Sequence, residues 1–197
     1  GEVDDLAGAR RLPGFPGRLR GALDLAALER SLAELVRRHE TLVAMVEDLA
    51  ERHEHALAFQ QLQGESLTRF TYRDVDVLSA AIARRLTDRG LRKGDRVVLG
   101  AKNQPLWPIA YFGTLRAGCV AVPVDADYEA DALANVVRAS QAKLCILGDG
   151  VVRPASLADE GVEVVELAEI GRTDPGGTLT APDVEIAEHD LASLIYT

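Results

Sequence analysis

The sequence predicts an α/β protein in which helices flank a mainly parallel sheet. Short apolar, often β-branched runs alternate with segments of helical periodicity along residues 56–197. The chain has 197 residues, enough for one medium domain, and 47% of them are hydrophobic, as in folded globular proteins. Strands that alternate with helices of about 10 to 15 residues form βαβ units, whose right-handed crossovers place helices on both faces of a sheet.

Two segments precede this alternating pattern. Residues 1–21 are rich in Gly, Pro and Arg, which favours a linker or an extended lead-in. Residues 22–55 contain neither Gly nor Pro and carry leucines at helical spacing after Asp24, a candidate N-cap, so they predict a helical segment. Whether this helix breaks near Glu40 and Thr41 stays open, because the periodicity fits both arrangements.

The alternating pattern begins with a strand and a helix. Residues 58–63 predict a strand, and residues 64–66 its turn. Thr71 and Asp74 have the spacing of a capping box, which predicts a helix start. The apolar stripe that follows continues to Leu86, and Gly90 is well placed to end the helix.

The later elements follow the same alternation. Further strands are predicted at residues 96–100, 119–123, 144–147, 162–167 and 191–197. Helices are predicted at about residues 106–117 and 129–139, and a loop interrupted by Gly and Pro at residues 171–186. We expect Trp107, Ile109 and Leu115 to pack the first of these helices against the sheet.

Composition excludes several classes of protein. The net charge is −9, and residues 149–190 hold 11 acidic against 2 basic side chains. An acidic surface repels polyanions, and no basic cluster with interleaved aromatics occurs, so nucleic-acid binding is excluded. No uncharged stretch is long enough to cross a bilayer, and the start lacks the pattern of a signal peptide. Cys119 and Cys145 lie in apolar runs, which predicts buried, reduced thiols and a cytoplasmic protein.

Isolated polar residues add little chemistry. The sequence contains no GxGxxG, complete P-loop, HExxH, CxxC or GxSxG motif. The four histidines are predicted to lie solvated at the surface: His39, His53, His55 and His189. The paired arginines are predicted on solvated helix faces rather than in anion sites: Arg37, Arg38, Arg84 and Arg85.

Three segments in a fixed order carry the strongest signal. They are RFTYRDVD at residues 69–76, KNQPLWPIAYFGTLRAGCVAVPVDADY at residues 102–128 and DLASLIYT at residues 190–197. Together they resemble the amino-terminal part of adenylate-forming enzymes, the superfamily of acyl-CoA synthetases, peptide-synthetase adenylation domains and luciferases. The resemblance covers about residues 41–197, and LRAGCVAVPVD is similar to a core motif close to L-K-A-G-x-x-Y-V-P-[IL]-D.

The third segment is where the resemblance places the chemistry. In this superfamily a strand ending in Tyr-Thr runs into a Ser/Thr/Gly-rich loop, ending in Pro-Lys-Gly, that wraps the ATP phosphates. The resemblance therefore implies that Tyr196 and Thr197 contact the phosphates and that the Thr197 hydroxyl ligates Mg²⁺. It also implies an α/β portion at residues 56–197 that is truncated at the phosphate loop, with no catalytic residue in this chain. The alternative is that LIYT only ends a buried strand.

The branch of the superfamily is indicated by weaker features. Asn103, Pro105, Trp107 and Tyr111 make the second segment more similar to long-chain fatty acyl-CoA ligases than to amino-acid adenylation domains. Ala126 departs from the pattern, since Pro commonly follows the Asp of the motif. Residues 18–42 resemble an early helix of peptide-synthetase condensation domains, without their HHxxxDG motif; a generic Leu/Ala/Arg helix is the alternative.

The function implied is that of a larger ligase. Enzymes of this superfamily form an acyl-adenylate from ATP and a carboxylic acid, then transfer the acyl group to a thiol of CoA or of a carrier protein's phosphopantetheine. The resemblance implies ATP and Mg²⁺ as cofactors, and the rest of the ligase domain as a partner. Lys93, Lys102 and Lys143 lie in the wrong motif contexts to replace the catalytic lysines. The isolated chain is expected to be inactive, and three classes stay open: a fatty acyl-CoA ligase, an adenylation module that loads a carrier protein, and a non-enzymatic interaction domain.

Overall fold

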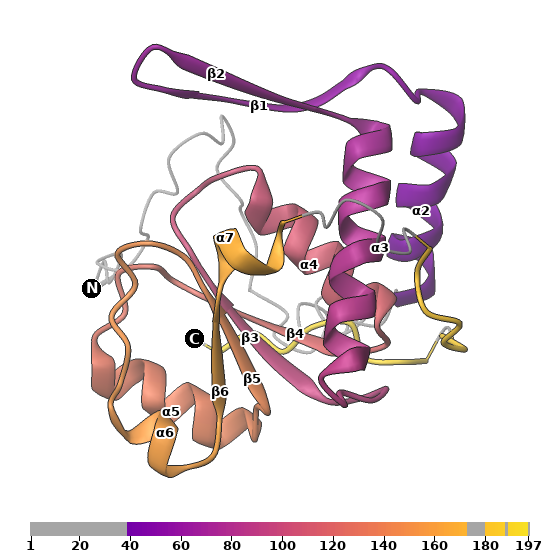
Figure 1. The fold of residues 1–197 in the computed structure, drawn as a ribbon. Coiled ribbons are helices and arrows are strands. Elements are labelled where there is room, and N and C mark those ends of the chain that lie inside the picture. Colours follow the sequence, from indigo (N-terminus) through magenta and orange to yellow (C-terminus); the bar gives the residue numbers. More distant parts are fainter. Residues whose placement is uncertain (1–38, 173–179, 188, 197) are drawn as a thin grey trace, which may run out of the picture.

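The computed structural model describes residues 39–172, 180–187 and 189–196, and it has an α/β architecture (Figure 1). The lead-in and the first half of the predicted helical segment, residues 22–38, lie outside the described residues. The first elements are α2 (His39–Arg52), β1 (Leu57–Gln63), β2 (Ser66–Thr71) and α3 (Tyr72–Asp88). The alternating part comprises β3 (Arg96–Gly100), α4 (Leu106–Arg116), β4 (Val120–Val124), α5 (Ala130–Ser140), β5 (Leu144–Leu147), α6 (Ser156–Asp159), β6 (Glu163–Glu166) and α7 (Leu167–Ile170).

The central sheet has four strands in the order β4-β3-β5-β6, and every pair is parallel. Val97 of β3 pairs with Ala121 on one side and with Leu144 on the other. Such strands are covered on both faces and are therefore rich in apolar residues. The four residues of β5, LCIL, are all buried. The predicted α/β class with a mainly parallel sheet is confirmed.

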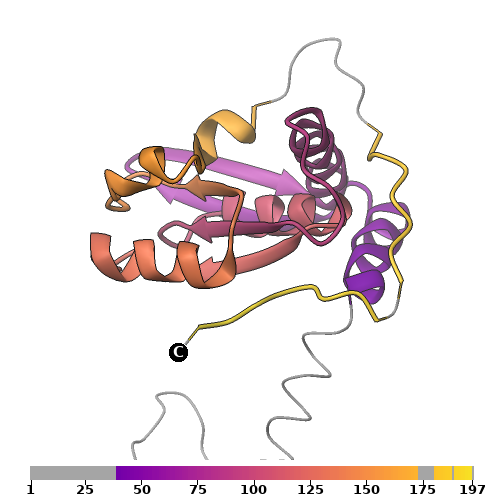
Figure 2. The same cartoon turned by 90° about the horizontal axis from the view of Figure 1, so that it is seen from below.

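Alternate residues of β3 separate the two faces of the sheet. Val97 and Leu99 belong to a core cluster with residues of α3 and α4, while Val98 belongs to a second cluster with residues of α5. This follows from the two-residue period of a strand. Figure 2 shows α4 and α5 on opposite sides of the sheet. Because the connections after β3 and β4 diverge to opposite faces, they leave the carboxyl edge of the sheet open between them.

Local chemistry fixes the start of α3 and its contact with α4. The N–H of Asp74 donates to the Thr71 hydroxyl at 3.2 Å, and the N–H of Thr71 donates to the Asp74 carboxylate at 2.7 Å, which confirms the capping box. A Cβ on Gly113 of α4 would lie 2.6 Å from a methyl carbon of Ile82 in α3. The close approach of these two helices therefore requires glycine at this position.

Several elements differ from the sequence prediction. Residues 66–71, predicted partly as a turn, form β2, which pairs antiparallel with β1 in a hairpin that projects from the body (Figure 1). Leu57, Leu62 and Leu67 of this hairpin are exposed. The short helices α6 and α7 were not predicted. The predicted strand at residues 191–197 is wrong for the residues described, because residues 191–196 form a single parallel bridge, between Ser193 and Ala121.

Burial corrects two predictions for polar residues. His39 is fully buried, whereas His53, His55 and His189 are exposed as predicted. Arg84 and Arg85 are half-buried, and Arg85 donates to the carbonyl of Ile170 at the end of α7 at 2.6 Å. Arginines satisfy the free carbonyls at helix C-termini, so this one holds α7 in place. Arg37 and Arg38 lie outside the described residues.

Two further expectations are confirmed. Cys119 and Cys145 are free and buried, and burial raises the pKa of each thiol to about 12. Ile109 and Leu115 are fully buried, while Trp107 is only half-buried. None of the helices that the structure describes combines the length and apolarity that crossing a bilayer requires.

Candidate nucleotide site at the carboxyl edge of the sheet

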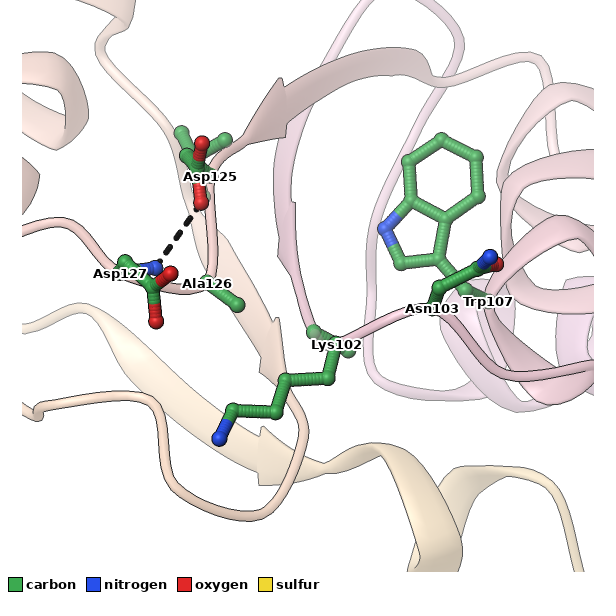
Figure 3. Close-up of a pocket in the computed structure, with 8 residues that line it drawn as sticks. Lys102, Asn103, Trp107, Asp125, Ala126 and Asp127 are labelled. Atoms are coloured by element: carbon green, nitrogen blue, oxygen red, sulfur yellow. Dashed lines mark hydrogen bonds between the residues drawn. The ribbon is translucent and has the colours of Figure 1, made fainter.

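A cavity of about 490 Å³ opens at the carboxyl ends of β3 and β4 (Figure 3). Ala101, Lys102 and Asn103 follow β3, Trp107 comes from the first turn of α4, and residues 124–127 end β4. In open α/β sheets, ligands bind outside the carboxyl ends of strands whose connections diverge to opposite faces. The position of the cavity therefore makes it the candidate site of the described residues.

The charged groups of this cavity do not by themselves attract a polyphosphate. Lys102 contributes one positive charge, and Asp125 and Asp127 contribute two negative charges, all on exposed side chains. The N–H of Asp127 donates to the Asp125 carboxylate at 3.0 Å, which stabilises the turn after β4 (Figure 3). Phosphates that bind beside this lining need additional donors from neighbouring segments.

Residues 189–196, the terminal segment, approach the same edge of the sheet. The N–H of Ala121 donates to the carbonyl of Ala192, and the N–H of Leu194 donates to the carbonyl of Ala121, both at 2.9 Å. The bridge is parallel, so the terminal segment runs in the same direction as β4. Tyr196 also packs against the core cluster that includes Val124 and Ala126, two lining residues of the cavity. In Figure 2 this segment, drawn in yellow, runs along the body towards the C-terminus.

The structure brings the three resemblance segments together. Arg116 of the second segment forms an ion pair of 2.8 Å with Asp76 of the first, and another of 2.9 Å with Glu47 of α2. The Tyr111 hydroxyl of the second segment lies 2.7 Å from the Ser193 hydroxyl of the third. Arg116 is buried, and its ion pairs join α2, α3 and α4. This arginine of the second motif is therefore structural.

A left-handed residue in the second motif also has a structural role. Gly118 has φ of +71° directly after α4, which residues with a side chain rarely adopt. A Cβ there would lie 2.7 Å from a methyl carbon of Val184. The glycine thus ends α4 and lets residue 184 pack closely against the turn.

The residues proposed for chemistry are only partly described. Tyr196 is half-buried and packs against the core cluster on the α5 face of the sheet, and Thr197 lies outside the described residues. Lys93 pairs with Asp190 at 2.7 Å and Lys143 with Asp95 at 2.8 Å, so both have structural partners. Lys102 reaches the cavity, which its sequence context gave no reason to expect. Only the parallel order of the strands, which places the end of β3 beside the end of β4, identifies it.

The described residues do not form a metal site. In the ranges that the structure covers, no group of three or more His, Cys, Asp or Glu side chains could hold a metal ion. Asp125 and Asp127 are two carboxylates on one turn, which is too few ligands for a dedicated Mg²⁺ site. The Mg²⁺ role of Thr197 therefore stays a prediction, and we derive no step through the metal.

The family of the chain is established by comparison. A model of the AMP-binding enzyme family matches residues 46–197, and the chain belongs to this family of adenylate-forming enzymes. The matched range includes all three segments and every lining residue of the cavity.

Individual relatives come from two branches. Phosphinothricin tripeptide synthetase PhsC of Streptomyces viridochromogenes is 26% identical over 173 residues, 88% of this chain and 16% of PhsC. A long-chain-fatty-acid–CoA ligase of Salmonella typhimurium is 36% identical over 111 residues, 56% of this chain and 19% of the ligase. The solved structure of a Mycobacterium tuberculosis fatty acyl CoA synthetase is similar in fold, with a TM-score of 0.67 at 24% identity over 82% of this chain and 32% of that one. The chain thus spans less than one third of each of these proteins.

Proposed function

We propose that this chain is the amino-terminal part of an ATP-dependent ligase that activates a carboxylic acid as its adenylate and transfers the acyl group to a thiol. One observation carries the proposal: the terminal segment forms a parallel bridge to β4 at Ser193, and Tyr196 packs against a core cluster that includes Val124 and Ala126 of the cavity lining. The residue that follows is Thr197, the proposed start of the phosphate loop. Family membership supports the reaction class.

In the proposed reaction, a carboxylate oxygen attacks the α-phosphorus of ATP and pyrophosphate leaves with the electron pair of the broken bond. The thiolate then attacks the acyl carbon, and AMP leaves. Transfers of this kind depend on alignment of the reacting groups more than on covalent help from the protein. The described residues contribute to alignment: β4 and the terminal segment fix the edge on which the phosphates lie. The basic groups that neutralise the phosphates belong to residues beyond this chain.

We propose a fatty acid as the activated acid. The Asn-Gln-Pro-Leu-Trp sequence at residues 103–107 resembles that of long-chain ligases, and the Salmonella ligase is more similar to this chain, where the two align, than PhsC is. Trp107 and Val124 add apolar surface to a cavity that also has charged side chains, which suits a ligand with an apolar part.

A carrier-protein acceptor is the second candidate. The alignment with PhsC covers 173 of the 197 residues, which leaves 24 unaligned at the two ends together. It therefore starts no later than residue 25 and includes residues 25–42. This range covers most of the condensation-like segment at residues 18–42, which supports a place in a peptide or polyketide assembly line.

Exchange of radioactive pyrophosphate into ATP tests the reaction class. The protein for this assay is the complete polypeptide encoded by the gene that contains this chain. We expect exchange that depends on an added carboxylic acid, with fatty acids active and amino acids inactive. Product analysis with CoA and with a phosphopantetheinylated carrier protein then separates the two acceptors. A complete polypeptide without any acid-dependent exchange would contradict the ligase and leave an interaction domain.

A further inference from the structure

The terminal segment lies beside β4 with few main-chain bonds to hold it. Among the described residues, the terminal segment makes two main-chain hydrogen bonds to β4, both at the Ser193 bridge. A strand held by one bridge can shift its register at little energetic cost, because register is normally fixed by a ladder of such bonds and by a buried side-chain pattern. Side chains must therefore contribute much of what fixes this segment along β4.

Among the described residues, two polar contacts between side chains hold the segment, in addition to the packing of Ala192, Leu194 and Tyr196 against the core clusters. The Tyr111 hydroxyl lies 2.7 Å from the Ser193 hydroxyl, and Lys93 forms an ion pair of 2.7 Å with Asp190. Ser193 is 5% exposed, so the first contact is shielded from water, whereas the Lys93 side chain is 41% exposed and its ion pair is screened. The buried hydrogen bond therefore discriminates more strongly between registers than the surface ion pair does.

Tyr111 is itself held rigidly. Its ring stacks on Trp107 with centroids 5.7 Å apart and an interplanar angle of 11°, and it meets Phe112 edge-on at 5.8 Å. A shift of the terminal segment by one residue would bring Ala192 or Leu194 to the position of Ser193. Neither side chain can bond the tyrosine, so the shifted register would leave a partly buried hydroxyl without this partner.

We propose that Tyr111 is a positioning residue: its hydrogen bond to Ser193 fixes the register of the terminal segment and thereby sets where Tyr196 and the phosphate-binding residues after it lie. This inference rests on the proposed ligase function for its catalytic consequence. Its structural part, the register of the segment, stands independently of that function. Tyr111 acts through Ser193 and need not touch a substrate.

Amide hydrogen exchange on the 197-residue chain tests the structural part. The N–H groups of Ala121 and Leu194 report on the bridge, and the N–H of Leu99 in β3 serves as an internal reference for global stability. We expect Tyr111→Phe and Ser193→Ala each to accelerate exchange of the two bridge amides about threefold to tenfold relative to the reference, since each removes one neutral hydrogen bond. The double variant should be no faster than either single one, because both hydroxyls act through one bond.

Tyr72→Phe is the matched control. Tyr72 is a half-buried tyrosine at the start of α3, and among the described residues its hydroxyl has no hydrogen-bond partner. This variant should leave the bridge amides unchanged. Bridge amides that are unaffected by Tyr111→Phe, that respond equally to Tyr72→Phe, or that exchange additively faster in the double variant would overturn the proposal.

The two half-reactions of the complete polypeptide test the catalytic part. Tyr111→Phe should reduce kcat for pyrophosphate exchange about threefold to tenfold, and should leave transfer from a preformed acyl-adenylate to the thiol unchanged. A general loss of packing would instead impair both steps. If the wild-type protein exchanges pyrophosphate and Tyr111→Phe does so at the same rate, the positioning role is refuted. If the wild-type protein shows no pyrophosphate exchange, the proposed ligase function is refuted, while the result from amide hydrogen exchange still stands.

Discussion

At the residue scale, burial determines the chemistry of His39. Its Nε2 lies 2.6 Å from the carbonyl oxygen of Leu115, which can only accept, so Nε2 carries the hydrogen. The other ring nitrogen, Nδ1, is buried and has no hydrogen-bond partner among the described residues. Desolvation by burial lowers the pKa of His39 below its ordinary value of 6.5, against smaller opposing effects from the Leu115 carbonyl and the Asp190 charge. Protonation would place a positive charge in a site from which burial excludes water.

The stability of the chain should therefore fall as His39 is forced to protonate. Because its folded-state pKa lies below the unfolded value of 6.5, the unfolded chain binds more protons, and the stabilising contribution present above about pH 6.5 is lost as the pH falls through the folded-state pKa. We expect the wild-type chain to lose stability between pH 7 and pH 5, by at most about 1.4 kcal/mol per pH unit from this one group. His39→Gln, which can still donate to Leu115, should flatten the profile measured by urea unfolding. His53→Gln, at an exposed position, should leave the pH profile of stability unchanged. Equal profiles for wild type and His39→Gln would contradict this account.

Leu115 provides a measure of core packing at the same scale. It is fully buried in α4, in a cluster with Ala121 and Ala192. Leu115→Ala should destabilise the chain by about 2 to 5 kcal/mol, through lost burial and the cavity that remains. Leu62→Ala is the matched control, since Leu62 is 70% exposed on the hairpin, and it should change stability by less than about 0.5 kcal/mol. A loss below about 1 kcal/mol for Leu115→Ala would mean that α4 does not pack as described.

At the scale of elements, α3 depends on its first turn. Thr71 ends β2 and also caps α3, so one side chain fixes the angle between hairpin and helix. Helix α3 is 17 residues long and packs on α4. The start of α3 therefore affects the core cluster that these two helices form with Val97 and Leu99.

Removing this cap should destabilise the chain by about 1 kcal/mol. Thr71→Ala deletes the hydroxyl that accepts from the N–H of Asp74, and losses for N-cap Thr range from about 0.5 to 2 kcal/mol. Thr71→Ser keeps the hydroxyl and should recover most of the loss in chemical denaturation. If Ser and Ala are equally destabilising, the methyl group of Thr71 matters and the cap does not.

Some elements could be predicted from the sequence and others could not. The parallel strands carry runs such as RVVLG and LCIL, whose composition and spacing identify them with little help from tertiary contacts. The second strand of the hairpin, SLTRFT, has no clear alternation, and it forms because it pairs with β1. The terminal run LASLIYT has strand composition but forms one bridge, since strand formation also needs a partner along its length.

The same contrast applies to the site. Tyr196 and Thr197 could be proposed from motif resemblance alone, and Tyr111 only as one of the residues that resemble long-chain ligases. The contact between Tyr111 and Ser193 joins positions that are 82 residues apart, and no local pattern indicates it. The burial of His39 depends in the same way on Leu115, which lies 76 residues further along the chain. Long-range contacts of this kind follow from the fold and could be found only there.

At the scale of the whole molecule, the sheet forms an edge to which separate segments contribute. The loops after β3 and β4 line the cavity, and the terminal segment arrives beside them in parallel register. The lining has two carboxylates and one ammonium group, so the proposed ligase needs further positive charge from outside this lining to bind a triphosphate. The proposed ligase therefore depends on the continuation of the chain after Thr197.

The most direct test of the central claim is a comparison of the two half-reactions in the complete polypeptide after Thr197→Ala. Adenylate formation, followed by pyrophosphate exchange, should slow about tenfold to a hundredfold, because contacts to the phosphates worth about 1.4 to 2.7 kcal/mol are lost in the transition state. Thr197→Ser keeps the hydroxyl and should retain most of the rate. Transfer of the acyl group from a preformed acyl-adenylate should stay nearly unchanged, because pyrophosphate has already left. Equal damage to both half-reactions, or an unchanged rate of pyrophosphate exchange, would contradict the claim and make Thr197 only the end of a structural segment.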